Sequence, residues 1–355
     1  MKKKFISIIL IIVLFITGCA GNKVKVIKGY NKYQKTFFDV FDTIIDFTAY
    51  TQSEEEYNQY YDLVKSEFER LHKLYNHFDS FEGVNNIKTI NDNAGIKPIK
   101  VDKDLFELIK FSKKMTEEYS DVTNMAFGSV LEIWHEYREE GLKNPKTAKL
   151  PKIEDLRKAN EHTSINKVIL DEEELTVFLE DSNMKLDLGA TSKGFASQLI
   201  MDKVKEKGCK SAILSAGGNI IALGKPMIEG RDKWIIGVQN PNLKENTKKP
   251  TIETIYGKDL TVVTSGNYQR FYTVDGKDYN HIISPKTLMP AENFTSVTVV
   301  AKDSSVADYL STTLFILDYE EGKNLIKKFK DVEVMWVDKN GKIKETEGFE
   351  KYLKD

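Results

Sequence analysis

The strongest constraint on the fold is a change in the spacing of apolar residues along the chain. Between residues 57 and 78 they recur every three or four positions, the period of an amphipathic α-helix; they are Tyr57, Tyr61, Val64, Phe68, Leu71, Tyr75 and Phe78. We interpret this stripe as core packing. Beyond residue 167, short runs of β-branched and aromatic residues indicate strands. Because the two periods mix without regular βαβ alternation, we expect an α+β fold with mainly antiparallel sheets and packed helices.

The same patterns predict individual elements. Strands are expected at 37–51, 167–170, 175–180, 184–188, 212–214, 234–238, 260–264, 296–301 and 332–337. Further helices are expected at 102–119, about 191–207, and 304–317. Residues 85–98 are rich in Asn and Gly and are predicted to be a loop, and 143–152 a surface connection containing two prolines.

The N-terminus has the layout of an export signal. Three lysines at positions 2–4 precede an apolar run at 6–16, which is shorter than the ~20 residues of a membrane span, and small residues then lead into Cys19. This order resembles a lipobox, so residues 1–18 are predicted to be a lipoprotein signal peptide and Cys19 to be acylated, with palmitate as one lipid. An ordinary signal peptide or a single anchor helix is disfavoured, because the chain has only two cysteines.

Lipidation of Cys19 would place the protein at the extracytoplasmic face of the cell membrane. Polar, lysine-rich residues 19–35 would form the tether, and residues 36–350 the globular domain. Cys209 would then be the one remaining thiol, so neither an internal disulfide nor a cysteine metal site is expected. Five histidines without a paired motif argue against zinc. A formal net charge of −2 gives no strong field to attract nucleic acid.

One segment, residues 185–194, combines a charged strand pattern with a helix start. Asp187 alternates with leucines, and small residues then open a helix that carries Lys193. A helix N-terminus suits a phosphate, and Asp187 could bind a ribose hydroxyl or an adenine amine. Alternatively, Thr191 simply caps the helix and Asp187 is an edge-strand charge; the residues alone leave both interpretations open.

Two further segments place small or polar residues after apolar strands. Gly217 and Gly218 allow close backbone approach or simply form a tight turn. Ser265-Gly266 reads as a turn, and His281 precedes an apolar pair and a proline. A single histidine is usually structural, although a neutral imidazole could also take a proton from an attacking hydroxyl.

The last segment, residues 307–312, places Asp308 and Thr312 four apart on a predicted helix, so that they share a face. A carboxylate and a hydroxyl beside a backbone carbonyl would form a partial Mg²⁺ site, completed by water and phosphate oxygens. The alternative is a solvent-facing aspartate and an ordinary helical threonine.

In this order, the segments resemble the ApbE family of FAD:protein FMN transferases. Residues 187–196 (DLGATSKGFA) resemble its D-L-G-x-x-x-K-G-[YF]-A, 217–219 its G-G-N, 264–268 its T-S-G-x-Y, 281–285 its H-I-I-D-P, and 307–312 its A-D-x-x-x-T. The chain departs from the family at Ser284, at Leu288-Met289, at 119–123, which match A-F-D-P-T loosely, and at Phe41-Asp42, where Met-Gly is usual.

The resemblance implies an ApbE-like, T-fold-like architecture and assigns roles to residues. His281 would be the general base. FAD contacts would be Phe41, Tyr119, Ser120, Asp121, Asp187, Lys193 and Ile283. Mg²⁺ ligands would be the carbonyl of Ala190, Asp308 and Thr312, with Ser311 as a further candidate.

The resemblance also implies a reaction. FMN would pass from FAD to a threonine or serine hydroxyl of an acceptor protein, with Mg²⁺ on the pyrophosphate and AMP as the leaving group. The acceptor would be a subunit of a membrane redox complex. Two alternatives remain open: hydrolysis of FAD to FMN and AMP, and non-catalytic flavin binding by a lipoprotein.

Overall fold

The structure is a computed structural model that describes residues 25–242 and 249–354. The predicted signal peptide, the acylation site Cys19 and the first part of the tether lie outside this range, and remain predictions. Within the described residues, no helix combines the length and the apolar character needed to cross a membrane.

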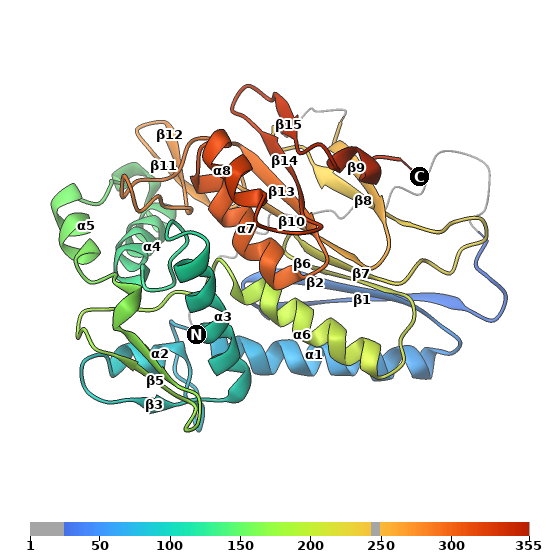
Figure 1. Cartoon of the computed structure of the whole chain (residues 1–355), viewed down its shortest axis with the longest axis horizontal. Coiled ribbons are helices and arrows are strands. Elements are labelled where there is room, and N and C mark those ends of the chain that lie inside the picture. The colour runs from blue at the N-terminus through green and yellow to red at the C-terminus, as the bar shows by residue number, and fades with distance from the viewer. Residues whose placement is uncertain (1–24, 243–248, 355) are drawn as a thin grey trace.

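An eight-stranded sheet forms the centre of the molecule (Figure 1). Its strands, in spatial order, are β1 (Asn31–Val40), β2 (Thr43–Thr51), β6 (Ala212–Ala216), β7 (Asn219–Leu223), β10 (Leu260–Gly266), β13 (Ser296–Ala301), β14 (Glu333–Val337) and β15 (Ile343–Glu345). Neighbouring strands in this sheet pair antiparallel. Together with the packed helices, this arrangement confirms the predicted α+β class.

Both faces of the sheet are covered, and alternate residues of a strand serve the two sides. Helices α1 (Glu54–Tyr75), α6 (Ser192–Glu206) and α7 (Ser304–Ile316) pack on one face, where Leu214 of β6 is fully buried. Its neighbour Ile213 packs on the other face against β8 (Trp234–Gln239) and β9 (Thr251–Gly257). Burying one large apolar side chain contributes about 1.5–3 kcal/mol, so this double core holds the sheet rigid.

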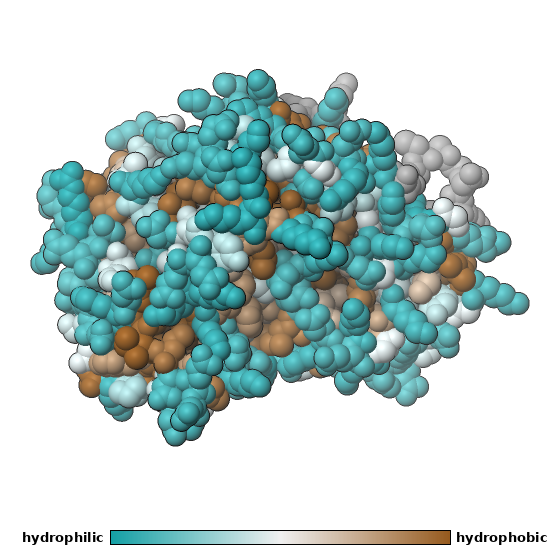
Figure 2. Space-filling model, viewed as in Figure 1, coloured by the Kyte–Doolittle hydropathy of each residue, from teal (hydrophilic) through white to brown (hydrophobic). Residues whose placement is uncertain are grey.

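Smaller elements gather at one end of the sheet (Figure 1). They are α2 (Ile87–Asp92), β3 (Ile99–Lys100), α3 (Lys103–Glu118), α4 (Gly128–Lys143), α5 (Ile153–Asn160), β4 (Val168–Asp171), β5 (Thr176–Leu179), β11 (Phe271–Val274), β12 (Lys277–Asn280) and α8 (Tyr319–Ile326). Charged and polar residues cover most of the face seen in Figure 2, and apolar residues show through mainly over the α3–β3–β5 part.

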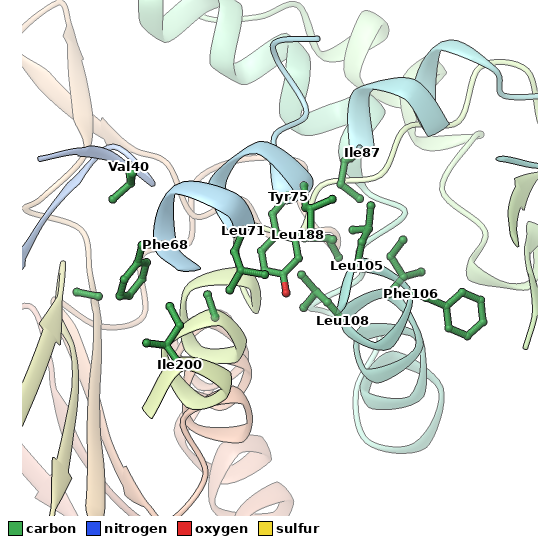
Figure 3. Packing of buried hydrophobic residues seen from close by; sticks show 14 of the residues in the cluster. Val40, Phe68, Leu71, Tyr75, Ile87, Leu105, Phe106, Leu108, Leu188 and Ile200 are labelled. Atoms are coloured by element: carbon green, nitrogen blue, oxygen red, sulfur yellow. The ribbon is translucent and has the colours of Figure 1, made fainter. Parts of the chain in front are cut away.

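A buried cluster joins α1 to these smaller elements and fixes the segment before α6 (Figure 3). Leu71 and Tyr75 of α1 face Leu105 of α3, and Leu188 lies among them with 2% of its surface exposed. Because Leu188 is held on both sides, the residues next to it, Asp187 and Gly189, have a fixed position.

Several predicted elements differ in the structure. Residues 37–51 form two strands and not one, because Phe41 and Asp42 adopt positive φ (52° and 50°) and reverse the chain. Residues 184–188 are not a strand: only Lys185 bridges, to Phe127. The predicted loop at 85–98 contains α2, whose cap Asn86 and Thr89 satisfy each other's backbone N–H groups in a capping box.

Two boundaries also shift. Helix α1 ends at Tyr75, so Phe78 leaves the apolar stripe and is 46% exposed instead of packing in the core. β1 begins at Asn31, within the predicted tether of residues 19–35, and Val26 bridges to Ile228. The folded domain therefore begins before residue 36. The helices expected at 102–119, 191–207 and 304–317 are present as α3, α6 and α7.

Candidate active site

Helices α6 and α7 meet at a contact that only glycine permits. A Cβ on Gly194 would lie 2.2 Å from the carbonyl oxygen of Ser304. The Gly194 N–H donates to Oδ2 of Asp308 at 2.7 Å. It therefore does not make the helical bond to Ala190, and the first bond of this helix runs from Phe195 to Thr191. The Ala190 carbonyl is left available to another partner.

Asp308 is a buried carboxylate, 4% exposed. Burial raises the pKa of its carboxyl, and the Lys193 ammonium and the Gly194 N–H act in the opposite direction. A carboxylate in this position gains from a nearby cation, because the aqueous solvation that it has lost must be replaced. The alternative of a solvent-facing aspartate is therefore wrong.

Hydroxyl groups complete this corner of the site. Ser265, at the end of β10, lies 2.8 Å from Oγ of Ser311 and 3.4 Å from Oγ1 of Thr312. Ser311 donates to the Asp308 carbonyl at 2.9 Å, so the hydroxyl of Thr312 is the less engaged of the two. We call Ala190, Gly194, Asp308, Ser311 and Thr312 the α6–α7 junction.

The donors at the α6–α7 junction fit a hard divalent cation. They comprise one carboxylate, one backbone carbonyl and hydroxyls, all of them oxygen. Among the residues that the structure describes, no group of three or more His, Cys, Asp or Glu side chains could hold a metal. A metal here would therefore have to complete its shell with water and ligand oxygens, as Mg²⁺ characteristically does.

The glycine pair ties the β1–β2 hairpin to β10. A Cβ on Gly217, which has a φ of 55°, would lie 2.1 Å from Oγ1 of Thr43. Gly218 adopts a φ of 98°, and its carbonyl accepts from the Thr264 N–H at 3.3 Å. The two glycines therefore form a tight turn and also allow the chain to approach Thr43 and Thr264 closely, so both interpretations apply.

His281 is held by a carbonyl that fixes its tautomer. Its backbone N–H and its Nδ1 both lie near the Arg270 carbonyl, at 3.2 and 3.1 Å. Because that oxygen can only accept, we assign the proton to Nδ1, which leaves Nε2 as an acceptor. Burial, followed by the charges of Arg270, Arg138 and Lys193, lowers the pKa of His281 to about 3. The imidazole is therefore neutral at neutral pH.

Asp187 and Phe41 are each held by neighbouring groups. Oδ1 of Asp187 accepts from the Gly189 N–H at 2.7 Å, and Oδ2 lies 3.6 Å from Nε2 of His77. The Phe41 N–H donates to Nδ1 of His72 at 3.2 Å, and the Phe41 ring meets Phe68 edge-on. Since residues 184–188 form no strand, Asp187 is not an edge-strand charge.

Thr191 occupies the N-cap position of α6 but makes no side-chain cap hydrogen bond. Its hydroxyl instead lies 2.9 Å from Oγ of Ser112 on α3 and 3.3 Å from the Leu188 carbonyl. The start of α6 is therefore not closed by this side chain, and the capping interpretation fails.

The other expected FAD contacts present fewer free groups. The Ile283 side chain is 4% exposed within a cluster that includes Trp134 and Tyr272, so only its backbone could meet a ligand. The Tyr119 ring lies tilted against Phe329 with centroids 4.5 Å apart, and the Ser120 carbonyl accepts from the Tyr309 hydroxyl. Asp121 is exposed, beside α7.

Helix α4 adds residues that the sequence patterns did not single out. His135 lies over Phe78, with ring centroids 4.5 Å apart, and Phe78 lies 3.8 Å from His77. Nη2 of Arg138 is 2.7 Å from Nδ1 of His135. We call Phe78, His135, Arg138 and Arg270 the α4 rim. The spacing of His135 and Arg138, three apart on one helix, was the available signal.

A separate hollow of about 680 Å³ lies against the outer side of α1, between residues 66–74, 83–85 and 100–102. It contains none of the motif residues. Arg70, which lines it, is paired with Glu67, Asp102 and Asp104, and so links α1 to α3. We assign this hollow a structural role and place the chemistry at the motifs.

Comparison with known proteins gives a consistent result. The sequence model described as the ApbE family matches residues 41–336. An FAD:protein FMN transferase of Klebsiella pneumoniae (strain 342) is 31% identical over 77% of this chain and 83% of its own length. One from Treponema pallidum (strain Nichols) is 30% identical over 74% and 73%.

Solved structures give the same result for the fold. The crystal structure of the ApbE protein of Thermotoga maritima aligns with a TM-score of 0.77 and 26% identity, over 92% of this chain and 100% of that one. The flavinyl transferase ApbE of Pseudomonas stutzeri aligns with a TM-score of 0.73 and 19% identity, over 91% and 96%, which supports the fold alone.

Proposed function

The chain belongs to the ApbE family and is a flavin transferase, and we propose that it transfers FMN from FAD to a threonine or serine hydroxyl of a target protein, with Mg²⁺, releasing AMP. The observation that carries the proposal is one arrangement. His281, with an acceptor Nε2, shares a site with Lys193, and Lys193 acts on the buried carboxylate of Asp308. A proton acceptor and a candidate metal ligand therefore both lie within range of the charge of one lysine.

In this proposal, the α6–α7 junction holds the metal. The Ala190 carbonyl, the Asp308 carboxylate and the Thr312 hydroxyl are the ligands, and Ser311 supports Thr312 through Ser265. When bound, Mg²⁺ would neutralise charge on the pyrophosphate. Lys193, one residue before Gly194, adds a fixed positive charge on the same side.

His281 is the proposed general base. Its Nε2 takes the proton from the acceptor hydroxyl as that oxygen bonds to the phosphorus on the FMN side. The pyrophosphate P–O bond breaks, AMP leaves with the electron pair, and FMN remains as a phosphoester. The pKa of His281 is low because of burial and neighbouring cations. An anionic substrate opposes those cations and raises the basicity of the imidazole when it is needed. Such base catalysis is typically worth ~10²–10⁴-fold.

The remaining residues bind the two ends of FAD. Asp187, whose position is set by Leu188 and by the Gly189 N–H, is placed to accept from a ribose hydroxyl or an adenine amine. Phe41 offers a half-buried ring at the hairpin turn, and Ile283 offers backbone groups. Tyr119, Ser120 and Asp121 would contribute at the edge of α3, chiefly through the exposed Asp121.

An acceptor assay tests the reaction. The protein is incubated with FAD, Mg²⁺ and a candidate acceptor domain, and the acceptor is examined for covalent flavin by mass spectrometry while AMP is quantified. We expect one AMP per flavin attached, and no reaction when EDTA removes the metal. AMP release without covalent flavin would instead identify an FAD hydrolase, and binding without AMP release a flavin carrier.

We further propose that the enzyme is anchored by lipid on Cys19 at the extracytoplasmic face of the cell membrane and acts on a membrane redox complex there. The signal-like residues 1–18 support this location. Labelling of cells with an alkyne palmitate should mark the wild type and not C19A, and C19A should leave the membrane fraction. Equal labelling of both would refute the anchor.

A further inference from the structure

Two arginines that the reaction above does not use face the same site as His281. Arg270 follows β10 and its Nη2 donates to the Asp42 carbonyl at 3.2 Å, which points its side chain toward the β1–β2 hairpin. Arg138 is on α4, where only 19% of its side chain is exposed. The Arg138 guanidinium is thus mostly buried, although the Arg270 guanidinium also acts on His281.

Helix α4 is fixed against the loop that carries His281. Nε1 of Trp134 donates to the Leu288 carbonyl at 3.0 Å. One turn beyond Arg138, a Cβ on Gly141 would lie 2.6 Å from the Tyr272 ring of β11. These two contacts, before and after Arg138, leave α4 little freedom to move relative to residues 271–288.

The other neighbours of Arg138 connect it with Asp187. Its Nη2 donates to Nδ1 of His135, and the His135 ring contacts the Phe78 ring. Phe78 in turn contacts His77, whose Nε2 lies near the carboxylate of Asp187. The charge of Arg138 therefore interacts with Asp187 and also with Arg270 and His281. Glu139, whose carboxylate is 3.8 Å from Nη2, is the acidic side chain paired with it.

Charges of both signs act on this position, and the charged groups that act on His281 are all cations. Arg138, Arg270 and Lys193 all act on His281, whereas Asp187 and Asp42 are the acidic groups that act on Arg138 besides Glu139. Burial, followed by the charge of Arg270, lowers the pKa of Arg138. Arg138 is partly desolvated and is repelled by the exposed Arg270, so an anion between the two guanidinium groups would stabilise both.

We propose that Arg138, oriented by His135, binds the phosphate groups of the flavin substrate together with Arg270. This rests on the proposed function for the identity of the substrate, but the anion site itself does not. A planar guanidinium can donate two parallel hydrogen bonds to phosphate oxygens, which fixes the phosphate as well as attracting it. Arg138 is thus a positioning residue for phosphoryl transfer.

Calorimetric titration of the wild type and R138Q separates phosphate binding from flavin binding. The probes are FAD, riboflavin, which has no phosphate, and inorganic pyrophosphate, which has no flavin. We expect R138Q to weaken FAD and pyrophosphate by about 10- to 100-fold and to leave riboflavin within about twofold. R157Q, which removes an exposed arginine on α5, is the matched control and should match the wild type for all three probes.

The outcomes distinguish this inference from the proposed function. Unchanged pyrophosphate affinity in R138Q, or equal losses for riboflavin and pyrophosphate, would overturn the phosphate role. If the wild type binds pyrophosphate through Arg138 but transfers no flavin, the anion site stands and the proposed function fails. If R138Q does not fold, R138K provides the test. It keeps the charge without the fork, so a pyrophosphate loss of only about 3- to 10-fold is expected, and no loss would refute bidentate binding.

Discussion

Lys193, next to the α6–α7 junction, and Arg138 and Arg270 of the α4 rim all act on His281, but the two regions are built differently. At the junction, backbone and small side chains meet in a buried contact, in which Gly194 lets Asp308 approach the start of α6. At the rim, the contacts are made by rings and guanidinium groups on longer side chains, and Phe78 is 46% exposed. The junction thus depends on close backbone contact, whereas the rim depends on contacts between side chains from separate segments.

Removing the carboxylate at the junction should have the largest effect. D308A should lower the flavinylation rate by about 10³-fold or more. A loss of several kcal/mol of charge stabilisation in the transition state slows a reaction by that factor. D308N, which keeps the size of the side chain, should be nearly as inactive. Rates measured over a Mg²⁺ series would check this, and an active D308A would remove Asp308 from the metal site.

The second largest effect is expected at His281. H281N should slow flavin transfer by about 10²- to 10³-fold, within the usual range of general-base catalysis. Asparagine can still donate to the Arg270 carbonyl, so FAD affinity should stay within a few-fold. Single-turnover rates and calorimetric FAD affinities separate the two quantities. A collapse of FAD binding with a modest rate change would make His281 a ligand contact and not a base.

The junction should also be sensitive to a single methyl group. G194A should lower the free energy of unfolding by about 1–3 kcal/mol, because the new Cβ would clash with the Ser304 carbonyl. It should also reduce activity by moving Ala190 away from Asp308. Urea unfolding measures the first effect, and K205A, near the exposed end of the same helix, should stay within about 0.5 kcal/mol of the wild type. A G194A protein of wild-type stability would contradict the close contact.

The smallest expected effect is a pH dependence of stability from His281. Its folded pKa of about 3 lies below the ordinary value of 6.5, so the unfolded chain binds the proton more readily. Its contribution to stability is present above pH 6.5 and is lost as the pH falls toward 3. H281N should therefore lose less stability than the wild type between pH 6.5 and 4 in urea titrations. Parallel curves for both proteins would show that the histidine is not perturbed.

Local patterns in the sequence identified the parts of the fold that depend on short-range physics. The apolar stripe of α1 is periodic, the runs of β10, β13 and β14 are short and rich in β-branched or other apolar residues, and the structure confirms these elements. The loop predicted at 85–98 missed α2, whose capping box uses Thr89 where the usual sequence pattern has Glu or Gln. The hairpin at residues 41–42 was missed because it depends on positive φ at Phe41 and Asp42, residues that carry no glycine signal.

The sequence by itself determined the family, the α+β class, and the motif residues on which the junction depends, because each motif encodes a local requirement such as a glycine at a close approach. Only the tertiary structure decided which motifs touch. Ser265 meets Ser311 and Thr312, and Gly194 meets Asp308, across separations that no local period reveals. The spacing of His135 and Arg138 is visible in the sequence, but only packing brings their neighbours Phe78, Asp187 and Arg270 close to them.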